Sequence, residues 1–286
     1  MKVNKVYSYW LIVPAGLIYV LLFLYPTAVS FFFSFTRWTL TEWEWIGFDN
    51  FKMFFEEPSL MIGFKNTLIF AVLTAGLKVI IGVFLAVILI SKIKTKRFIR
   101  STVFFPVLVS TIAVGITFQM LMHPSNGLIN RTLELIGITG PDWLGNPNLA
   151  IYSIALVDVW KGVGIATVIL IAGMMSIPKD YYEAHQIDGG TSVNAFWHIT
   201  LPLSKPAINA VILLALIGGL RTFDLVWAMT GGGPGFSSDL IASIIYKQYQ
   251  AGFYGLSTAG NVLLFILVAC IVYPIFKFLT RKEVDL

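Results

Sequence analysis

Residues 67–91 read TLIFAVLTAGLKVIIGVFLAVILIS, an apolar run of 25 residues in which Lys78 is the one charged side chain. As an α-helix this run would be about 37 Å long, enough to cross the roughly 30 Å hydrocarbon core of a bilayer. A buried helix of a water-soluble domain does not need so many consecutive apolar residues. The sequence therefore predicts that residues 67–91 span a membrane.

The composition of the whole chain indicates the same class. Of its 286 residues, 57% are hydrophobic and 12% are charged, whereas ordinary soluble domains carry about 25% charged residues. A soluble fold of this size would lack polar groups for its surface. Soluble enzymes, disordered proteins and fibrous repeats are therefore excluded, and we expect no binding to nucleic acid, because the net charge of +5 reflects membrane topology instead.

Six segments have the length and apolar content of a transmembrane helix. They are residues 10–35, 67–91, 103–122, 149–175, 207–227 and 260–278. The sequence thus predicts an all-α integral membrane protein with six transmembrane helices. The expected divisions are residues 1–9 as the N-terminus, 10–35 as the first span, 36–66 as an outer loop, 67–279 as a core of five helices and 280–286 as a tail.

The loops between these spans differ in their content of Lys and Arg. With six spans, both termini share one side of the membrane with loops 92–102 and 176–206, and that side carries twelve Lys and Arg residues against five on the other side. Positive loops stay in the cytoplasm. We therefore expect both termini to be cytoplasmic, with Trp38, Trp43 and Trp45 of the outer loop at the membrane interface.

The inner loop begins at residues 177–190 with IPKDYYEAHQIDGG. Pro178 suits the first position of a helix, where its missing N–H costs nothing. The glycine pair that begins at Gly189 ends that helix, because glycine accepts a positive φ. Thr191 or its neighbour Ser192 can cap a second short helix over residues 191–199. The sequence predicts a helix–turn–helix on the cytoplasmic side.

Six residues of this loop form a pattern with characteristic spacing. They are Glu183, Ala184, Asp188, Gly189, Leu201 and Pro202. The pattern resembles the EAA loop of ABC importer permeases, which in that family forms the coupling helix that docks into the ATPase subunit. Two positions depart from the family pattern, because His185 and Gly190 stand where alanine is usual.

The resemblance covers nearly the whole chain and is to the carbohydrate-uptake branch, of the maltose and glycerol-phosphate type. Further matching segments are FDNF (48–51), NT (66–67), Arg100 with FFP (104–106), WKGVG (160–164) and TGGGP (230–234). The glycine-rich segment that begins at Gly231 lacks the Lys-Ser/Thr of a phosphate-binding loop, so we expect only a tight reversal there.

The resemblance implies a translocation subunit that is not itself an enzyme, in a bacterial inner membrane. It implies four kinds of partner: a second permease in a heterodimer, two ATP-binding subunits, an extracytoplasmic solute-binding protein and the sugar substrate. ATP and Mg would be bound by the partner subunits, so this chain is expected to hold no cofactor and no metal.

Five ionisable residues fall within the predicted spans. They are Lys78, Asp158, Lys161, Arg221 and Asp224. Each costs about 2.5–3.5 kcal/mol at the bilayer centre on insertion scales, so such residues face a bundle interior or a water-filled cavity. Two of the possible pairs, Asp158–Lys161 and Arg221–Asp224, share a helix face at i, i+3, and Lys78 has no obvious partner.

Two interpretations of these charges stay open. They can neutralise each other as internal pairs, or they can line a substrate cavity, which the resemblance favours. The cavity residues expected on the second interpretation are Asp158, Trp160, Lys161, Gly218, Gly219, Thr222, Phe223, Asp224 and Trp227. If both i, i+3 pairs form, little net charge faces the cavity, and we expect a neutral oligosaccharide, with a glycerol phosphate or an acidic sugar as the alternative substrate.

Two other function classes compete with an importer permease. An ion-coupled secondary transporter would use Asp158 and Asp224 as ion sites near broken helices. A membrane enzyme would need a nucleophile, a metal site or paired carboxylates at one depth, and the sequence, with three histidines and one cysteine, indicates none of these. Transport after ATP depletion, compared with transport after a protonophore, distinguishes the importer permease from the ion-coupled secondary transporter.

Overall fold

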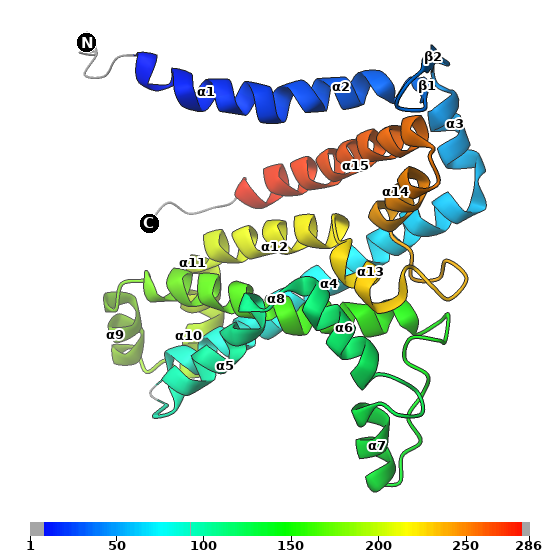
Figure 1. Ribbon diagram of the computed structural model, residues 1–286. Coiled ribbons are helices and arrows are strands. Elements are labelled where there is room, and N and C mark those ends of the chain that lie inside the picture. The colour runs from blue at the N-terminus through cyan, green and yellow to red at the C-terminus, as the bar shows by residue number, and fades with distance from the viewer. Residues whose placement is uncertain (1–8, 92, 282–286) are drawn as a thin grey trace. The chain divides into compact units, whose positions relative to one another are not determined.

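The computed structural model describes residues 9–91 and 93–281, which form helices and one short β-hairpin (Figure 1). The described chain divides into two compact units. One unit comprises the described residues up to Pro58 together with residues 245–265, and the other comprises Ser59–Ile244 together with the described residues from Ile266 onward. Each unit is described by itself.

The first unit starts with an apolar helical segment in which no residue of Val13–Phe33 is buried. A 3-10 turn, two α-helices and a π-helical turn make up this segment: η1 (Tyr9–Leu11), α1 (Val13–Tyr19), η2 (Val20–Leu24) and α2 (Tyr25–Phe33). Val13–Phe33 form a run of 21 residues, which is long enough and apolar enough to cross a membrane. None of the residues in its most apolar 18-residue stretch is buried. The π-helical turn η2 ends two residues before Pro26, which has no backbone N–H to donate to a helical hydrogen bond.

A small hairpin and a helix follow in the same unit. Strand β1 (Thr36–Trp38) pairs antiparallel with β2 (Trp43–Trp45), with Arg37 opposite Glu44. Helix α3 (Asp49–Glu56) carries the buried Asn50, whose Nδ2 donates to the carbonyl oxygens of Ser34 and Thr36 at 2.9 Å each. This amide fixes α3 to the end of α2, so the predicted outer loop is folded rather than open.

The second unit is built around one central helix, α8 (Ala150–Met175). In the most apolar 18-residue stretch of this helix, 56% of the residues are buried. The corresponding share for α4 (Pro58–Ile90) is 33%. Helices α5 (Lys96–Leu108) and α12 (Lys205–Leu220) both pack against α8. One core cluster joins α4, α8 and α12 near their predicted cytoplasmic ends: Ala86, Leu89, Ala166, Leu170, Ile171, Met174 and Val211.

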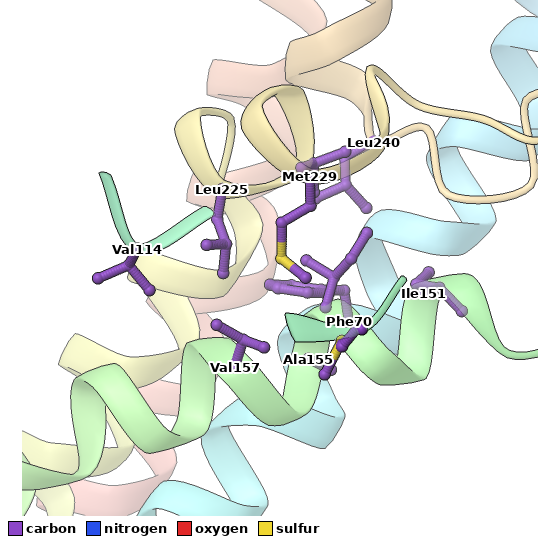
Figure 2. Packing of buried hydrophobic residues seen from close by; sticks show 11 residues of the cluster. Phe70, Val114, Ile151, Ala155, Val157, Leu225, Met229 and Leu240 are labelled. Atoms are coloured by element: carbon purple, nitrogen blue, oxygen red, sulfur yellow. The ribbon is translucent and has the colours of Figure 1, made fainter. Parts of the chain in front are cut away.

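A second cluster lies where α4, α6 (Thr111–Leu121), α8 and α13 (Asp224–Thr230) meet. Figure 2 shows Leu225 and Met229 of α13 pointing toward the α8 side chains, among them Val157. Phe70 of α4, fully buried, completes the packing. The charged residues expected at a cavity lie on α8 and α13, so this core fixes the relative positions of their two helices.

Four predicted spans appear as continuous helices of membrane-spanning length. These are Val13–Phe33, α4, α8 and α15 (Tyr254–Thr280). Helix α4 is 33 residues long, so its first nine residues lie in the segment predicted as outer loop. Counting each of two bent helix pairs as one span gives six spans.

The prediction of one continuous helix over residues 103–122 is wrong. The structure has α5 and α6 instead, bent by 100° at a break between them. Pro106 lies in the last turn of α5, and Val109 and Ser110 take extended backbone with ψ of 140° and 135°. Proline removes a helical donor, and the extended backbone at Val109 and Ser110 separates the two helices, so the chain turns here.

The prediction of one helix over residues 207–227 is also wrong. Helix α12 ends at Leu220, and α13 begins only at Asp224. The second helix of the predicted inner loop, made of α10 (Ser192–Ala195), the π-turn η3 (Phe196–Thr200) and α11 (Leu201–Leu203), runs into α12 with a bend of 66°. The span and the loop therefore meet at Ser204.

The predicted outer loops contain further helices, namely α7 (Leu128–Leu135) and α14 (Ile241–Gln250). The tight reversal predicted after the fifth span is confirmed, because Gly231 ends α13 in the left-handed conformation with φ of +59°. Asn66 of α4 holds the segment that follows, donating from Nδ2 to the carbonyl oxygens of Ser237 and Asp239 at 2.8 and 3.1 Å. This contact explains why an asparagine stands there.

Candidate functional site

The loop between α8 and α12 forms the predicted helix, bend and second helix. Helix α9 (Asp180–Ile187) ends at Asp188, and Gly189 follows with φ of +78°. The side chain of Thr191 then caps α10 by accepting from the backbone N–H of Asn194 at 3.3 Å. A bond between Tyr182 Oη and Thr200 Oγ1, 3.0 Å long, ties the two arms together.

The residues that match the EAA pattern occupy different parts of this loop. Glu183 and Ala184 are exposed on α9, and Asp188 and Gly189 are exposed at its end. Leu201 and Pro202 are half-buried at the start of α11, on the far side of the loop. The loop therefore presents its acidic residue and its bend, while its proline closure supports the turn into α12.

Large apolar side chains are also exposed on this loop. Ile187, Val193 and Trp197 are 86%, 70% and 59% exposed. Exposed apolar groups next to a carboxylate are typical of a surface that a partner protein covers. The loop has the form of a projecting element that could fill a groove.

The two departures from the family pattern meet in space. A Cβ added at Gly190 would lie 2.1 Å from Nε2 of His185. His185 is half-buried, and its Nε2 is 3.4 Å from the carbonyl oxygen of Thr191. The imidazole therefore occupies the space that an alanine at position 190 would need, and the two unusual residues are compensating.

We predict that Gly190→Ala displaces the His185 ring and lowers uptake about fivefold, since coupled neighbours typically interact by 0.5–3 kcal/mol. His185→Ala with Gly190→Ala should recover uptake, because the ring that clashes is then absent. The measurement is ATP-dependent uptake by the four proteins of a double-mutant cycle. An additive loss in the double mutant would contradict the contact.

A cavity of about 400 Å³ lies between α5, α8 and the break before α13, within the size range of small-molecule sites. Its lining residues are Val107, Thr111, Asp158, Lys161, Gly162, Ile165, Arg221, Thr222, Phe223, Asp224 and Leu225. Four of these are ionisable, and they come from both sides of the cavity. The break in the fifth span is what turns the Arg221–Asp224 segment toward α8.

Five of the nine residues expected at the cavity line it: Asp158, Lys161, Thr222, Phe223 and Asp224. The other four, Trp160, Gly218, Gly219 and Trp227, are not among the lining residues. Trp160 contacts Phe118 with tilted rings whose centroids are 5.1 Å apart, and Trp227 stacks on Phe223 at 5.7 Å. The prediction missed Val107 and Thr111, although Pro106 and Ser110 signal the break that places them there.

The expected i, i+3 charge pairs do not form. Lys78 Nζ of α4 lies 2.5 Å from Asp158 Oδ2, so Asp158 pairs with the residue for which the sequence offers no partner. Arg221 and Asp224 lie on opposite sides of the helix break, where helical spacing no longer applies. Lys161 therefore faces the cavity without Asp158 to neutralise it, and the expectation of a neutral sugar loses its premise.

No group of three or more His, Cys, Asp or Glu side chains able to hold a metal ion occurs within residues 9–91 and 93–281. The polar and aromatic residues that line the cavity are two carboxylates, two cations, two threonines and one phenylalanine. Such residues can accept hydrogen bonds from a polyhydroxylated molecule and donate hydrogen bonds to it, and the aromatic ring can stack on its apolar face.

Residues 78–283 match the family described as "Binding-protein-dependent transport system inner membrane component". The match includes α8, the projecting loop and the cavity. The chain belongs to this family, and it is an integral membrane permease subunit of the ABC importer class.

Relatives with known names cover almost the whole chain. It is 32% identical to the trehalose/maltose transport system permease protein MalF of Thermococcus litoralis, over 91% of this chain and 89% of that protein. It is 32% identical to the multiple sugar-binding transport system permease protein MsmF of Streptococcus mutans, over 95% and 96% of the two chains. It is 31% identical to the sn-glycerol-3-phosphate transport system permease protein UgpA of Pectobacterium atrosepticum, over 96% and 94%.

Solved structures share the fold. A chain of a bacterial ABC transporter involved in the import of the acidic polysaccharide alginate matches with a TM-score of 0.85 and 24% identity, over 95% of this chain and 94% of that one. The MetNI methionine ABC transporter in an inward-facing conformation matches with a TM-score of 0.57 and 18% identity, over 78% and 95%. These likenesses support the fold described above.

Proposed function

We propose that this chain forms half of the translocation pathway of an ATP-driven sugar importer and that it is not itself an enzyme. A second permease, in a heterodimer, would supply the other half. Two ATP-binding subunits would bind ATP and Mg, and an extracytoplasmic binding protein would deliver the sugar. Both termini and the α9 loop would lie on the cytoplasmic side of the inner membrane, because the termini and the loops on that side carry the excess of Lys and Arg.

The observation that carries this proposal is the projecting α9–α10 loop. It is long, folded and capped, and it exposes Glu183 and Ile187 on α9 and Trp197 on η3. Exposed apolar side chains on a folded loop are typical of a surface that a partner protein covers. Docking of this loop into an ATP-binding subunit would couple nucleotide state to the orientation of the cavity, provided that the docked loop binds the two ATPase states differently.

The sugar class of the substrate is supported by the printed names of the relatives, which include trehalose/maltose, multiple-sugar and sn-glycerol-3-phosphate systems. The cavity lining is consistent with a polyhydroxylated ligand. A neutral oligosaccharide and an acidic or phosphorylated sugar both belong to this class, and they differ in what Lys161 and Arg221 would bind.

The test of function is uptake of a labelled sugar by cells that carry the whole transport system. We predict that ATP depletion stops uptake while a protonophore, at preserved ATP, leaves it within about twofold. The reverse result would favour an ion-coupled secondary transporter. That alternative would use Asp158 and Asp224 as ion sites, and the pairing of Asp158 with the cation of Lys78 argues against a second cation at Asp158.

The test of substrate is ATPase stimulation in proteoliposomes that contain the complex and its binding protein. Maltose, maltotriose and raffinose serve as neutral probes, and glycerol 3-phosphate and a uronate serve as anionic ones. Stimulation by any of these sugars supports the sugar class, and the charge of the sugar that stimulates identifies the subclass. Stimulation by an amino acid alone would contradict the proposal.

A further inference from the structure

The Lys78–Asp158 pair is unlike the other ion pairs of the described residues. Its side chains are 10% and 18% exposed, whereas those of Arg37–Glu44 and Lys52–Asp49 are all more than 60% exposed. Taking two charges out of water is costly, and their attraction offsets that cost only in good geometry. A membrane helix that keeps such a pair requires an explanation.

The opposite helix is shaped to receive Lys78. A Cβ added at Gly162 of α8 would lie 2.6 Å from Cε and 3.0 Å from Nζ of Lys78. Gly162 is one helical turn after Asp158, so the lysine stem crosses α8 where no side chain obstructs it. The glycine therefore sets the path by which the ammonium reaches the carboxylate.

Only one of the two carboxylate oxygens is used by this pair. Lys78 Nζ contacts Oδ2, and no hydrogen bond to Oδ1 occurs among residues 9–91 and 93–281. An ionised carboxylate offers about four lone-pair sites. Asp158 and Gly162 both line the 400 Å³ cavity, while Lys78 does not.

We propose that Lys78 is a positioning residue for substrate recognition. It stands behind the cavity wall and holds the Asp158 carboxylate in one orientation, so that Oδ1 accepts a hydrogen bond from a sugar hydroxyl. Asp158 touches the substrate and Lys78 does not. This inference rests on the proposed sugar importer, and it assigns a role to the one in-span charge that the sequence leaves unexplained.

The experiment measures sugar binding to the purified, nucleotide-free complex by calorimetry, with the best sugar from the ATPase test as the probe. Asp158→Asn and Lys78→Met should each weaken binding about tenfold, the usual scale for a hydrogen bond to a charged group. Lys78→Arg keeps the cation and should stay within about threefold of the parent. Equal binding by Lys78→Met and the parent would overturn the proposal.

The double variant Lys78→Met with Asp158→Asn distinguishes the positioning role from a purely structural ion pair. It removes both charges, so thermal stability should recover relative to the single Lys78→Met variant, while sugar binding should remain about tenfold weak. Full recovery of binding together with stability would show that the pair only neutralises itself.

A milder variant covers the case in which Lys78→Met does not fold. Gly162→Ala keeps both charges but displaces the lysine stem, and it should weaken sugar binding. Gly76→Ala on α4 is the matched control, because a Cβ there meets nothing within 4 Å. Equal binding by Gly162→Ala and Gly76→Ala would contradict the positioning role.

The parent complex distinguishes this inference from the proposed function. If ATP depletion fails to stop uptake, or if no sugar binds or stimulates, the importer assignment itself fails. If the parent imports and binds sugar while the Lys78 variants bind as well as the parent does, only the positioning role fails.

Discussion

Glu183→Lys is expected to reduce ATP-dependent uptake more than tenfold while the permease still inserts in the membrane. Glu183 is exposed on α9, at the centre of the proposed docking surface for an ATP-binding subunit. The family resemblance implies a basic groove on that subunit, and a lysine would place like charges against each other. Disrupting one partner of a hydrogen-bonded charge pair at an interface costs about 2–5 kcal/mol.

Two measurements check this result: uptake by membrane vesicles and co-purification of the ATP-binding subunit with the permease. Glu134→Lys is the matched control, because Glu134 is an exposed glutamate on α7 and its replacement makes the same change in net charge. Only the Glu183 variant should lose the ATP-binding subunit. Normal uptake by a well-expressed Glu183→Lys protein would contradict the docking role of α9.

The membrane class and the projecting loop could both be predicted because their signals are local. Length and hydropathy of an uninterrupted run suffice for α4 and α8. The stop of α9 at Gly189 follows from one residue that accepts a positive φ. Each of these features depends on residues a few positions apart, and the structure has them where the sequence puts them.

The two helix breaks and the charge pairing could not be obtained by the same reasoning. Hydropathy averages over a window, so an apolar run that bends by 100° between α5 and α6 resembles a straight one. Proximity along a helix favoured Lys161 as the partner of Asp158, whereas the actual partner, Lys78, is 80 positions away in the sequence. Gly162 was the one sequence feature that pointed to the Lys78–Asp158 pair, since it leaves space for the lysine side chain. It could not be interpreted without knowing which helix packs against α8 there.

Gly218 and Gly219 illustrate the same limit. Both were expected to admit a ligand or to open the fifth span near them. Neither lines the cavity, although α12 does end directly after them, at Leu220. A Cβ at Gly219 would lie 2.7 Å from Cα of Ala71 and 2.9 Å from Oγ1 of Thr74, on α4. A Cβ at Gly218 would meet nothing within 4 Å. One glycine is a close helix–helix contact and its neighbour faces open space.

Gly219→Val is therefore expected to destabilise the second unit by about 1–3 kcal/mol or more, the usual cost of overpacking a tight contact. The obstructing atom of Ala71 belongs to the backbone, so it cannot move aside as a side-chain end can. Small residues at helix contacts let transmembrane backbones approach closely, and valine removes that approach. The measurement is thermal unfolding of the detergent-purified protein together with its yield from the membrane.

Gly218→Val is the matched control, one position earlier in the same helix and with the same loss of a glycine. Because both variants place a β-branched residue near the end of α12, any effect of helix propensity is shared between them. The difference in unfolding temperature therefore measures the contact of Gly219 with α4. If the two variants unfold at the same temperature, the α4–α12 contact does not limit stability, and the close approach of Gly219 to Ala71 has no energetic consequence.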